Sequence, residues 1–207
     1  TEPYKPLRLT IPGKGGSGKS VLIDTIATVL RTMFNCKQCV EIVAPTGSAA
    51  YNAGGSTMHH FAEFPRFIKD MEIPPAKLKR LLQKYSKLVV LVGDERSMMT
   101  SLNLGLLEDT SSKCMHGGNR EQYHWGGIPI LILVGDDYQL PPIMSGAFDA
   151  LSHKVTERFS QQAPIQQQLI NNGRNQFLEI GKDVMTLQTA KRQLPNQQKL
   201  QQLCYAM

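Results

Sequence analysis

Residues 13–20 carry the pattern G-x-x-x-x-G-K-S, which constrains the fold of this chain more than any other feature. The pattern lies between residues 7–11, whose apolar side chains alternate as in a strand, and residues 20–33, whose apolar side chains recur at helical spacing. A strand, a glycine turn and a helix in this order direct several backbone N–H groups at one anion. Glycine is needed there because it adopts positive φ and because no Cβ keeps a phosphate away from those groups. The pattern therefore predicts a bound nucleoside triphosphate; the alternative is a glycine-rich turn that only caps a helix.

The residues of this loop have distinct expected roles. The Lys19 ammonium is expected to reach the β- and γ-phosphates, and the Ser20 hydroxyl to hold Mg²⁺. The residues expected to bind the nucleotide are Gly13, Gly15, Gly16, Ser17, Gly18, Lys19 and Ser20. The loop indicates that a nucleotide binds, but not what its binding is used for.

Size and composition indicate a globular chain. It has 207 residues, of which 41% are hydrophobic, enough for one domain with a sizeable core. No apolar run approaches the ~20 residues that a membrane helix needs, so no membrane partner is expected. No signal peptide is visible, although the chain opens with Thr1 and ends at Met207 as if both ends were cut. An intracellular protein is expected, nuclear or mitochondrial if eukaryotic and otherwise cytoplasmic.

The net charge of +6 permits a polyanionic partner without proving one. Most basic residues are scattered along the sequence, but one group recurs at helical spacing. This group consists of Lys77, Lys79, Arg80, Lys84 and Lys87. It fits a solvated helix face or a phosphate-binding one, and the solvated face is the simpler interpretation.

The four cysteines give no strong signal of a metal site. Cys36 and Cys39 have the spacing of half a zinc site, but no second Cys or His pair follows at a matching interval. Cys114 and Cys204 are isolated. Reduced structural thiols are the expectation for an intracellular protein.

Segments with strand patterns alternate with segments with helix patterns along the chain. Strands are expected at residues 7–11, 40–44, 87–93, 129–134 and 184–187, and helices at residues 20–33, 49–53, 76–85 and 101–108. Residues 113–127 are expected to form a loop or insertion, and the glutamine-rich residues 160–176 a surface helix or loose connection. The alternation predicts an α/β fold whose functional residues gather at the carboxyl ends of parallel strands.

Two carboxylates follow the apolar strand that ends at residue 92. Asp94 is expected near the Mg²⁺, directly or through water, and Glu95 is expected to orient and deprotonate the attacking water. Hydrolysis needs both, because one carboxylate cannot easily serve as metal partner and base together. The alternative is an acidic pair that caps a helix at Ser97, but a complete phosphate loop upstream favours the catalytic interpretation.

Two more polar residues follow later strands. Gln139 lies in a loop stiffened by Pro141 and Pro142, and its uncharged amide could contact a γ-phosphate or the lytic water. Spacing alone equally allows a proline-ended loop that senses no nucleotide. Arg192 follows the last expected strand, where a guanidinium suits the charge on a transferring phosphoryl group. Taken alone, such an arginine would be a surface residue.

The order of these motifs resembles the first motor domain of superfamily-one DNA helicases of the Pif/RecD branch, and the Pif-type members most closely. The segments that carry the resemblance are residues 13–20, 44–50, 55–59, 93–98, 135–142 and 192–193. The resemblance implies a P-loop NTPase (RecA-like) fold, a parallel sheet flanked by helices. It implies a single motor domain at residues 1–193, with residues 194–207 as the start of a truncated continuation.

The resemblance also implies an activity. The chain is expected to be a fragment of an ATP-dependent DNA helicase, which couples ATP hydrolysis to 5′–3′ translocation on single-stranded DNA and to duplex unwinding in replication, repair or recombination. ATP would be the nucleotide, with Mg²⁺, and Lys19 and Glu95 would act with Gln139 as γ-phosphate sensor and Arg192 as arginine finger. A second motor domain is expected that this chain does not contain.

Residues 45–50 and 57–61 are implied by the resemblance to face single-stranded DNA. The residues expected to contact it are Thr46, Ser48, Thr57, His59 and Phe61. Hydroxyls and exposed N–H groups suit phosphates, whereas His59 and Phe61 offer flat rings to bases. Core packing is an equally open interpretation of Phe61.

Two residues depart from the usual pattern of this family. Arg96 stands where an aliphatic residue is usual, and Asp137 where an aromatic one is usual. Neither replaces a catalytic group, but Asp137 is expected to add negative charge near the phosphates and so to affect the rate.

Two other functions stay open at the level of sequence. One is a P-loop ATPase or small-molecule kinase unrelated to DNA. The other is an inactive remnant of a mobile-element helicase that only binds nucleic acid. The intact Lys19, Asp94, Glu95 and Gln139 argue against the remnant.

Overall fold

The computed structural model describes residues 5–65, 68, 72–116, 124–139, 142 and 162–188. In this part of the chain, five parallel strands form one sheet in the order β1-β5-β4-β2-β3. The strands are β1 (Leu7–Pro12), β2 (Val40–Ala44), β3 (Ser56–Thr57), β4 (Val90–Gly93) and β5 (Ile130–Gly135). The parallel α/β sheet predicted from the alternation of strand and helix patterns is therefore confirmed.

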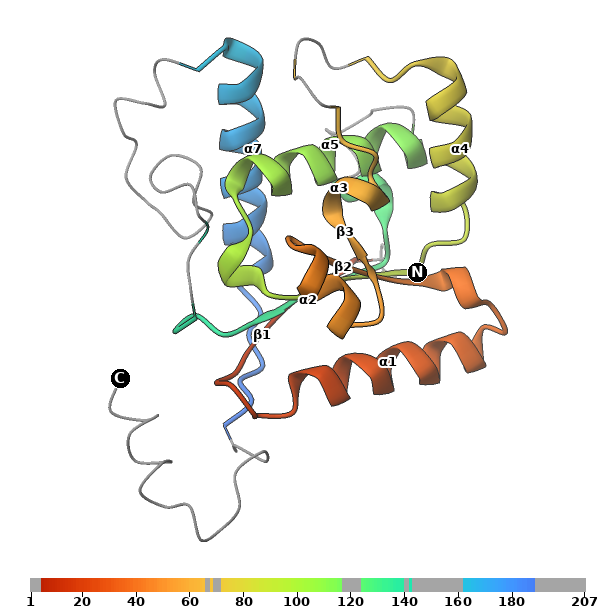
Figure 1. Ribbon diagram of the computed structural model, residues 1–207. Coiled ribbons are helices and arrows are strands. Elements are labelled where there is room, and N and C mark those ends of the chain that lie inside the picture. The colour runs from red at the N-terminus through yellow and green to blue at the C-terminus, as the bar shows by residue number, and fades with distance from the viewer. Residues whose placement is uncertain are drawn as a thin grey trace, which may run out of the picture.

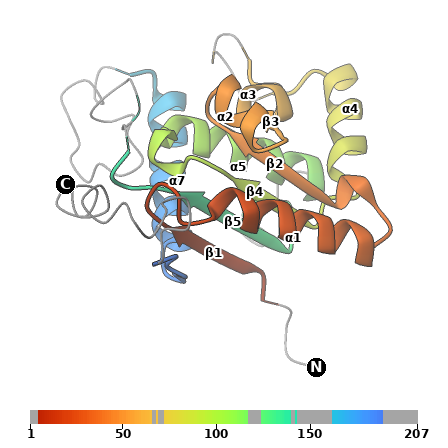
Figure 2. The same cartoon turned by 60° about the horizontal axis from the view of Figure 1, so that its bottom comes forward.

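Helices cover both faces of this sheet (Figures 1 and 2). They are α1 (Lys19–Met33), α2 (Gly47–Asn52), α3 (Met58–Phe61), α4 (Pro75–Tyr85), α5 (Ser101–His116) and α7 (Pro164–Ile180), with 3-10 turns η1 (Lys37–Cys39), η2 (Arg96–Met98) and η3 (His124–Gly127). α1 lies on one face, below the sheet in Figure 1, and α4 and α5 lie on the other. None of the described helices is long and apolar enough to cross a membrane.

The central strands send successive side chains into two separate cores, because neighbouring residues of a strand point to opposite faces. On β4, Val92 joins the core that contains Ile23 of α1, whereas Leu91 joins the core that contains Tyr85 of α4 and Leu104 of α5. All five side chains are buried. Burial on both faces explains why the sequence of β4 is apolar without interruption.

Helices α5 and α7 pack with their backbones in direct contact. A Cβ on Gly105 would lie 2.0 Å from the carbonyl oxygen of Leu169, and one on Gly173 would lie 1.9 Å from that of Ser101. Leu169 is fully buried. The glutamine-rich segment is therefore a helix, as one interpretation predicted, with one side exposed and the other buried. Two glycines allow α7 to bury one side against α5, a contact that composition does not show.

The segment predicted to be a loop at residues 113–127 contains the last turn of α5 and the turn η3. Trp125 is 1% exposed, and its Nε1 donates to Oε1 of Gln176 at 2.7 Å. The buried Glu108 accepts from the backbone N–H of Trp125 at 3.2 Å and from Nδ2 of Asn172 at 2.6 Å. These hydrogen bonds fix η3 between α5 and α7, so the loop prediction is wrong for the described part of this range.

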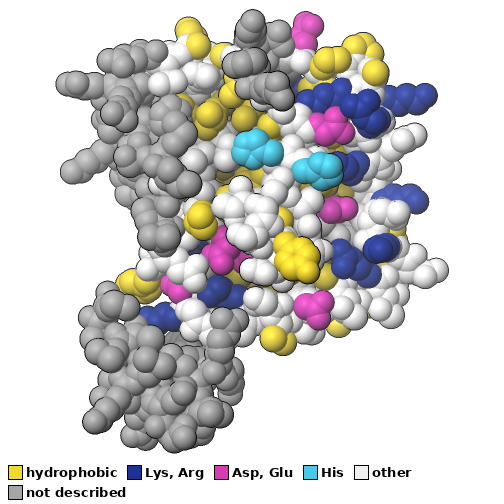
Figure 3. All heavy atoms as spheres, viewed as in Figure 1, with side chains coloured by type: hydrophobic (Ala, Val, Ile, Leu, Met, Phe, Trp, Pro, Cys, Tyr) yellow, Lys and Arg dark blue, Asp and Glu magenta, His cyan; other side chains and the backbone are white. Residues whose placement is uncertain are grey.

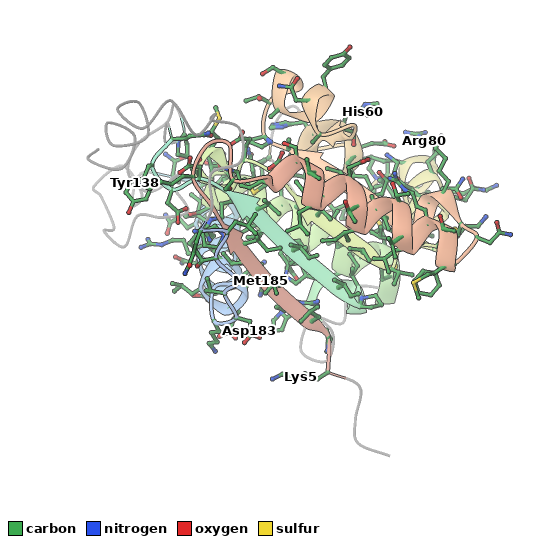
Figure 4. All side chains as sticks on the ribbon, turned by 90° about the horizontal axis from the view of Figure 1, so that it is seen from below. Lys5, His60, Arg80, Tyr138, Asp183 and Met185 are labelled. Carbon is green, nitrogen blue, oxygen red and sulfur yellow. The ribbon has the colours of Figure 1, made fainter. Side chains whose placement is uncertain are left out.

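The last described segment runs beside β1. The N–H of Met185 donates to the carbonyl of Thr10 at 2.9 Å. The N–H of Leu187 donates to the carbonyl of Pro12, also at 2.9 Å, and the pairing is parallel. Met185 is seen beside β1 in Figure 4. The strand predicted at residues 184–187 is present only as two isolated bridges, from Val184 to Thr10 and from Leu187 to Gly13, so this segment lies along β1 without forming a sixth strand of the sheet.

Candidate nucleotide-binding site and nucleic-acid face

Loops from three neighbouring strands meet at the carboxyl edge of the sheet. The phosphate loop (residues 13–20) follows β1, the acidic pair follows β4, and a tight turn that ends at Gln139 follows β5. They border a pocket of about 320 Å³, whose walls include Lys19, Glu95 and Gln139 as well as glycines of the phosphate loop. Lys19, Glu95 and Gln139, which the sequence predicted to act together, are therefore brought to one pocket.

The phosphate loop has the backbone conformation that its glycines predict. Gly16 has φ 81° and Gly18 has φ 91°, left-handed values that residues with a Cβ rarely adopt. Gly18 is the N-cap of α1, and no side chain in the described part of the chain caps this helix end. The first N–H groups of α1 are therefore available to an anion, for which a helix N-terminus is a suitable site.

Lys19 lies folded over the phosphate loop. Its Nζ donates to the carbonyl oxygens of Gly13 at 2.6 Å and Lys14 at 3.1 Å. Phosphate oxygens would replace these neutral acceptors with charged ones, which bind an ammonium more strongly. Ser17 is 8% exposed, and its Oγ has no hydrogen-bond partner among the described residues. Because a buried hydroxyl without a partner is costly, this atom also favours a polar ligand in the loop.

Asp94 is a buried carboxylate, 8% exposed, next in the chain to Glu95 of the pocket. Its Oδ1 accepts from the backbone N–H of Glu95 at 2.9 Å. Burial raises the pKa of Asp94, whereas that hydrogen bond and the Lys19 ammonium lower it. The carboxylate is thus held in one orientation close to the lysine that is expected to bind phosphate.

Glu95 has a strained backbone and a side-chain oxygen without a partner. Its φ of 54° and ψ of 49° are left-handed, which costs a residue with a Cβ about 1–3 kcal/mol. Its Oε2 is buried and unpaired among the residues that the structure describes. Burial and then the neighbouring Asp94 raise the pKa of Glu95, and Lys19 lowers it. A raised pKa brings this carboxylate towards the range in which a general base works well.

The capping alternative for Glu95 is not supported. Glu95 is the N-cap residue of η2, yet its side chain makes no capping hydrogen bond within the described residues. Backbone strain of this kind persists only where the surroundings enforce it, and it is concentrated at functional sites. The structure therefore favours the catalytic interpretation of Glu95.

The turn that carries Gln139 is organised by Asp136. The N–H of Tyr138 donates to Oδ1 of Asp136 at 3.1 Å, and the N–H of Gln139 to its carbonyl oxygen at 3.1 Å. This turn brings Gln139 to the pocket, in keeping with the sensor interpretation rather than the loop with nothing to sense. Arg192 lies outside the described residues, so its role as an arginine finger stays a prediction.

Asp137 does not add unpaired negative charge beside the pocket, contrary to expectation. Its Oδ2 accepts from Nη2 of Arg96 in an ion pair. The two residues that depart from the usual family pattern therefore neutralise each other.

Four of the five residues predicted to face DNA are helix N-caps or exposed side chains. Thr46 and Thr57 are the N-caps of α2 and α3, where each Oγ1 accepts from a backbone N–H at 3.2 Å and 3.1 Å. Ser48 and His59 are exposed. His60 is also exposed on α3 and was not predicted, although its place next to His59 could have suggested it. Figure 3 shows histidine side chains over α3, with lysines and arginines nearby, and Figure 4 labels His60.

The prediction that Phe61 contacts DNA is wrong for this structure. Its ring is 1% exposed and packs against Tyr85, with 5.0 Å between ring centres. The Lys84 ammonium lies 5.2 Å from the same ring. Core packing was the open alternative, and the enclosure of Phe61 between α3 and α4 decides for it.

The cations of α4 are largely engaged by the protein itself. Lys84 donates to the carbonyl oxygen of Phe61 at 2.9 Å, and Lys77 donates to that of Glu63. Arg80 forms an ion pair with the Glu63 carboxylate at 3.0 Å. These contacts attach α4 to the residues that follow α3, so this face positions the α3 segment rather than being purely solvated.

Cys36 is the N-cap of η1 and Cys39 is its last residue, and the two have different environments. Cys39 is buried, which raises the pKa of its thiol, whereas Cys36 is partly exposed. Within the described residues, no group of three or more His, Cys, Asp or Glu is placed to hold a metal ion.

Comparison with known proteins identifies the family. The family described as PIF1-like helicase matches residues 5–180. This chain belongs to that family. ATP-dependent DNA helicase PIF1 of Candida albicans is 37% identical over 135 residues, which cover 64% of this chain and 14% of that protein. ATP-dependent DNA helicase RRM3 of Saccharomyces cerevisiae is 34% identical over 134 residues, covering 63% of this chain and 18% of that protein.

Solved structures agree with this assignment. The crystal structure of Pif1 helicase from Candida albicans matches with a TM-score of 0.68 and 27% identity, over 95% of this chain and 39% of that one. Pif1 helicase from Bacteroides, crystallised with ADP-AlF3 and ssDNA, shares the fold with a TM-score of 0.60 and 20% identity, over 94% of this chain and 41% of that one. The predicted P-loop NTPase fold is thereby confirmed. The chain spans only 14% to 18% of the two curated relatives' length.

Proposed function

We propose that this chain is the ATP-hydrolysing motor domain of a DNA helicase, which couples hydrolysis to 5′–3′ movement along single-stranded DNA and to duplex unwinding in replication, repair or recombination. The observation that carries the proposal is the single pocket in which Lys19, Glu95 and Gln139 meet. The relatives are ATP-dependent DNA helicases, which supports ATP as the nucleotide and DNA as the track.

Each residue of the pocket has a chemical task in this proposal. Lys19 and the N-terminus of α1 hold the β- and γ-phosphates and stabilise the charge that develops on them. Glu95 accepts a proton from a water molecule as the oxygen of that water attacks the γ-phosphorus. The bond between the γ-phosphorus and the oxygen that bridges to the β-phosphate breaks, and this oxygen leaves with ADP. The Gln139 amide contacts the γ-phosphate or the attacking water. The left-handed backbone of Glu95 aims its carboxylate into the same pocket.

The residues at the pocket also fit Mg²⁺. This ion prefers oxygen ligands and usually keeps several waters, so one or two protein oxygens and the phosphates suffice. The exposed hydroxyl of Ser20 and the buried carboxylate of Asp94 are the oxygens available for it. When bound, Mg²⁺ would neutralise phosphate charge during the transfer.

A nucleic-acid face on α2 and α3 would couple the hydrolysis to DNA. Ser48, His59 and His60 are exposed on α2 and α3, where hydroxyls suit phosphates and imidazole rings suit bases. β2 leads into α2 and also pairs with β4, and the N–H of Asp94 donates to the carbonyl of Val43 on β2 at 2.8 Å. A shift of the DNA-facing helices can therefore reach the acidic pair through one strand.

A second motor domain and the Arg192 finger complete the motor in this proposal. A pocket open at one side holds ATP, and closure against another domain would exclude water and bring further charge to the γ-phosphate. Arg192 follows the segment at residues 184–187, which pairs with Thr10 and with Gly13 at the start of the phosphate loop. Only a short stretch of chain therefore separates Arg192 from a residue that contacts this loop.

ATP hydrolysis by the chain and by its Glu95→Gln variant tests the proposal. We expect single-stranded DNA to stimulate hydrolysis, most strongly when the second motor domain is present, and Glu95→Gln to lower kcat by about 10²–10⁴-fold. Glu179→Gln, a matched change on the exposed end of α7, should leave the rate unchanged. Hydrolysis that ignores DNA would instead favour an ATPase unrelated to DNA. Equal and negligible turnover of both proteins, with DNA still bound, would favour the inactive remnant.

A further inference from the structure

We propose that the ion pair between Arg96 and Asp137 is a positioning device, which holds the Glu95 loop and the Gln139 turn at a fixed separation across the pocket. The inference rests on the proposed function, because it concerns the geometry of hydrolysis at that site. It assigns a role to two residues that the chemistry of the pocket does not use directly. Each is joined to a pocket residue through a short stretch of backbone.

The Arg96 side chain is a buried charge with a specific partner. It is 8% exposed, whereas Asp137 is 38% exposed. A buried guanidinium is costly unless a carboxylate and hydrogen bonds compensate its charge. Nη2 of Arg96 donates to Oδ2 of Asp137, but Nε has no hydrogen-bond partner among the described residues. The Asp137 carboxylate thus compensates the charge of the guanidinium.

Packing restricts Arg96 to this orientation. Its Cζ lies 5.9 Å from the ring centre of Phe177 on α7, so the guanidinium rests on an aromatic face. On the β5 side, a Cβ on Gly135 would lie 2.7 Å from Cγ of Arg96 and 2.8 Å from its backbone nitrogen. Gly135 therefore leaves just enough room for Arg96 to cross the end of β5. A side chain enclosed in this way cannot easily turn to another acceptor.

The chain connects this ion pair to both functional residues. Arg96 follows Glu95 directly, and the left-handed backbone of Glu95 needs support from its surroundings to persist. Asp137 lies inside the turn in which Tyr138 and Gln139 donate to Asp136. One ion pair thus ties the residue after the expected base to the turn that carries the expected sensor. The ion pair acts by fixing the positions of Glu95 and Gln139, since neither Arg96 nor Asp137 lines the pocket itself.

The geometry predicts that the ion pair affects turnover but not nucleotide binding. The phosphates are expected to be held by Lys19 and the N-terminus of α1, whereas Arg96 and Asp137 pair with each other. Loss of the pair would let Glu95 and Gln139 move relative to the γ-phosphate, and displacements of about 1 Å can lower a rate about 10²-fold. A residue that only stabilised the fold would lower the melting temperature without separating kcat from affinity.

Steady-state hydrolysis and binding of a non-hydrolysable Mg·ATP analogue are measured for Asp137→Asn, Asp137→Glu, Arg96→Met and the double variant Arg96→Met/Asp137→Asn. We expect Asp137→Asn to lower kcat by about tenfold to a hundredfold, with analogue affinity and cooperative melting retained. Asp137→Glu should restore most of kcat because it keeps the charge. The double variant should be no slower than Arg96→Met, since both changes break one interaction. Glu179→Gln, which breaks the exposed pair with Lys182, is the matched control.

Amide hydrogen exchange separates this inference from the proposed function. If the ion pair joins the two loops, Asp137→Asn should accelerate exchange at residues 94–98 as well as at residues 136–139. Faster exchange at residues 136–139 alone would overturn the inference, even if the unmodified chain hydrolysed no ATP. In an active protein, a wild-type kcat for Asp137→Asn, or additive losses in the double variant, would overturn it while leaving the proposed function intact.

Discussion

The Lys19 ammonium lies 2.6 Å from the carbonyl oxygen of Gly13 in the same phosphate loop. Lys19 is expected to bind the phosphates of the nucleotide from this position. The contact holds a flexible side chain over the helix N-terminus, so little freedom is left to lose when a phosphate takes the place of the carbonyl. Lys19 is thus preorganised by the loop itself, which is an advantage for affinity.

Replacement of Lys19 by methionine should weaken the binding of Mg·ATP at least about tenfold, because a hydrogen bond between charged groups contributes about 1.5–3 kcal/mol. Binding is measured by titration calorimetry. Lys182→Met removes the same charge from an exposed pair with Glu179 and should leave affinity unchanged. Equal affinities of all three proteins would contradict the assigned role of Lys19.

Substitutions at His59 and Phe61 should separate DNA binding from stability. His59→Ala, on an exposed side chain, should lower affinity for single-stranded DNA by about 1 kcal/mol or more, the usual contribution of one stacked base, without changing the melting temperature. Phe61→Ala empties a buried site and should destabilise the fold by about 3–5 kcal/mol. Fluorescence anisotropy and thermal melting provide the two measurements. A large loss of DNA affinity in a stable Phe61→Ala protein would show that the ring is not confined to the core.

A methyl group at Gly173 should disturb the packing of α7 on α5. The added Cβ would lie 1.9 Å from the carbonyl oxygen of Ser101, which is backbone and cannot turn away. We expect Gly173→Ala to reduce the free energy of unfolding by about 1–3 kcal/mol or more, measured by urea denaturation. Gly47→Ala is the matched control, since no described atom lies within 4 Å of its added Cβ. A Gly173→Ala protein as stable as this control would show that the helices separate without cost.

Stability near Glu41 should depend on pH in a defined direction. Burial raises the pKa of Glu41 above its ordinary value of 4.5, and Lys84 and Arg31 lower it only in part. The folded state therefore binds a proton at Glu41 more tightly than the unfolded state does. The resulting contribution to the free energy of unfolding is complete below the pKa of Glu41 in the unfolded state, and it is lost as the pH rises through the pKa of Glu41 in the folded state. Glu41→Gln should leave the melting temperature nearly unchanged at pH 4 and raise it at pH 7. Glu179→Gln serves as the exposed control. A larger gain at pH 4 than at pH 7 would contradict the sign.

The thiols should react in the order of their exposure. Burial raises the pKa of Cys114 to about 11, so little thiolate exists there at pH 8. In a Cys204→Ser protein, which removes the thiol outside the described residues, iodoacetamide should label the partly exposed Cys36 first. Cys114 should be labelled only when the protein unfolds. Mass spectrometry of the native protein would disprove this order if Cys36 and Cys114 gained label at the same rate.

The phosphate loop and the acidic pair could be placed from sequence because their chemistry depends on neighbours in the chain. Gly16 and Gly18 need positive φ wherever the loop is placed, and Asp94 and Glu95 follow a strand whose apolar run marks burial on both faces. Parallel strands then bring such loops to one edge. Local pattern and strand direction were enough to predict the pocket.

Burial at the ends of helices could not be predicted in the same way. Phe61 offers the same ring to DNA or to Tyr85, and only the position of α4 decides between them. Trp125 follows a polar, glycine-rich stretch, yet Glu108 of α5 and Gln176 of α7 enclose it. In both cases the deciding contact comes from a residue distant in sequence, to which local composition is insensitive.

The sequence by itself determined that this chain has a phosphate loop, an acidic pair behind a buried strand and a parallel α/β sheet, because glycine conformation and side-chain periodicity are local properties. The tertiary structure alone decided that α7 lies against α5, that Phe61 is core, and that Arg96 meets Asp137. Those outcomes depend on which helix surfaces pack against one another when the helices cover the two faces of the sheet. Contacts between distant segments arise from packing and charge pairing in three dimensions, which a linear pattern does not encode.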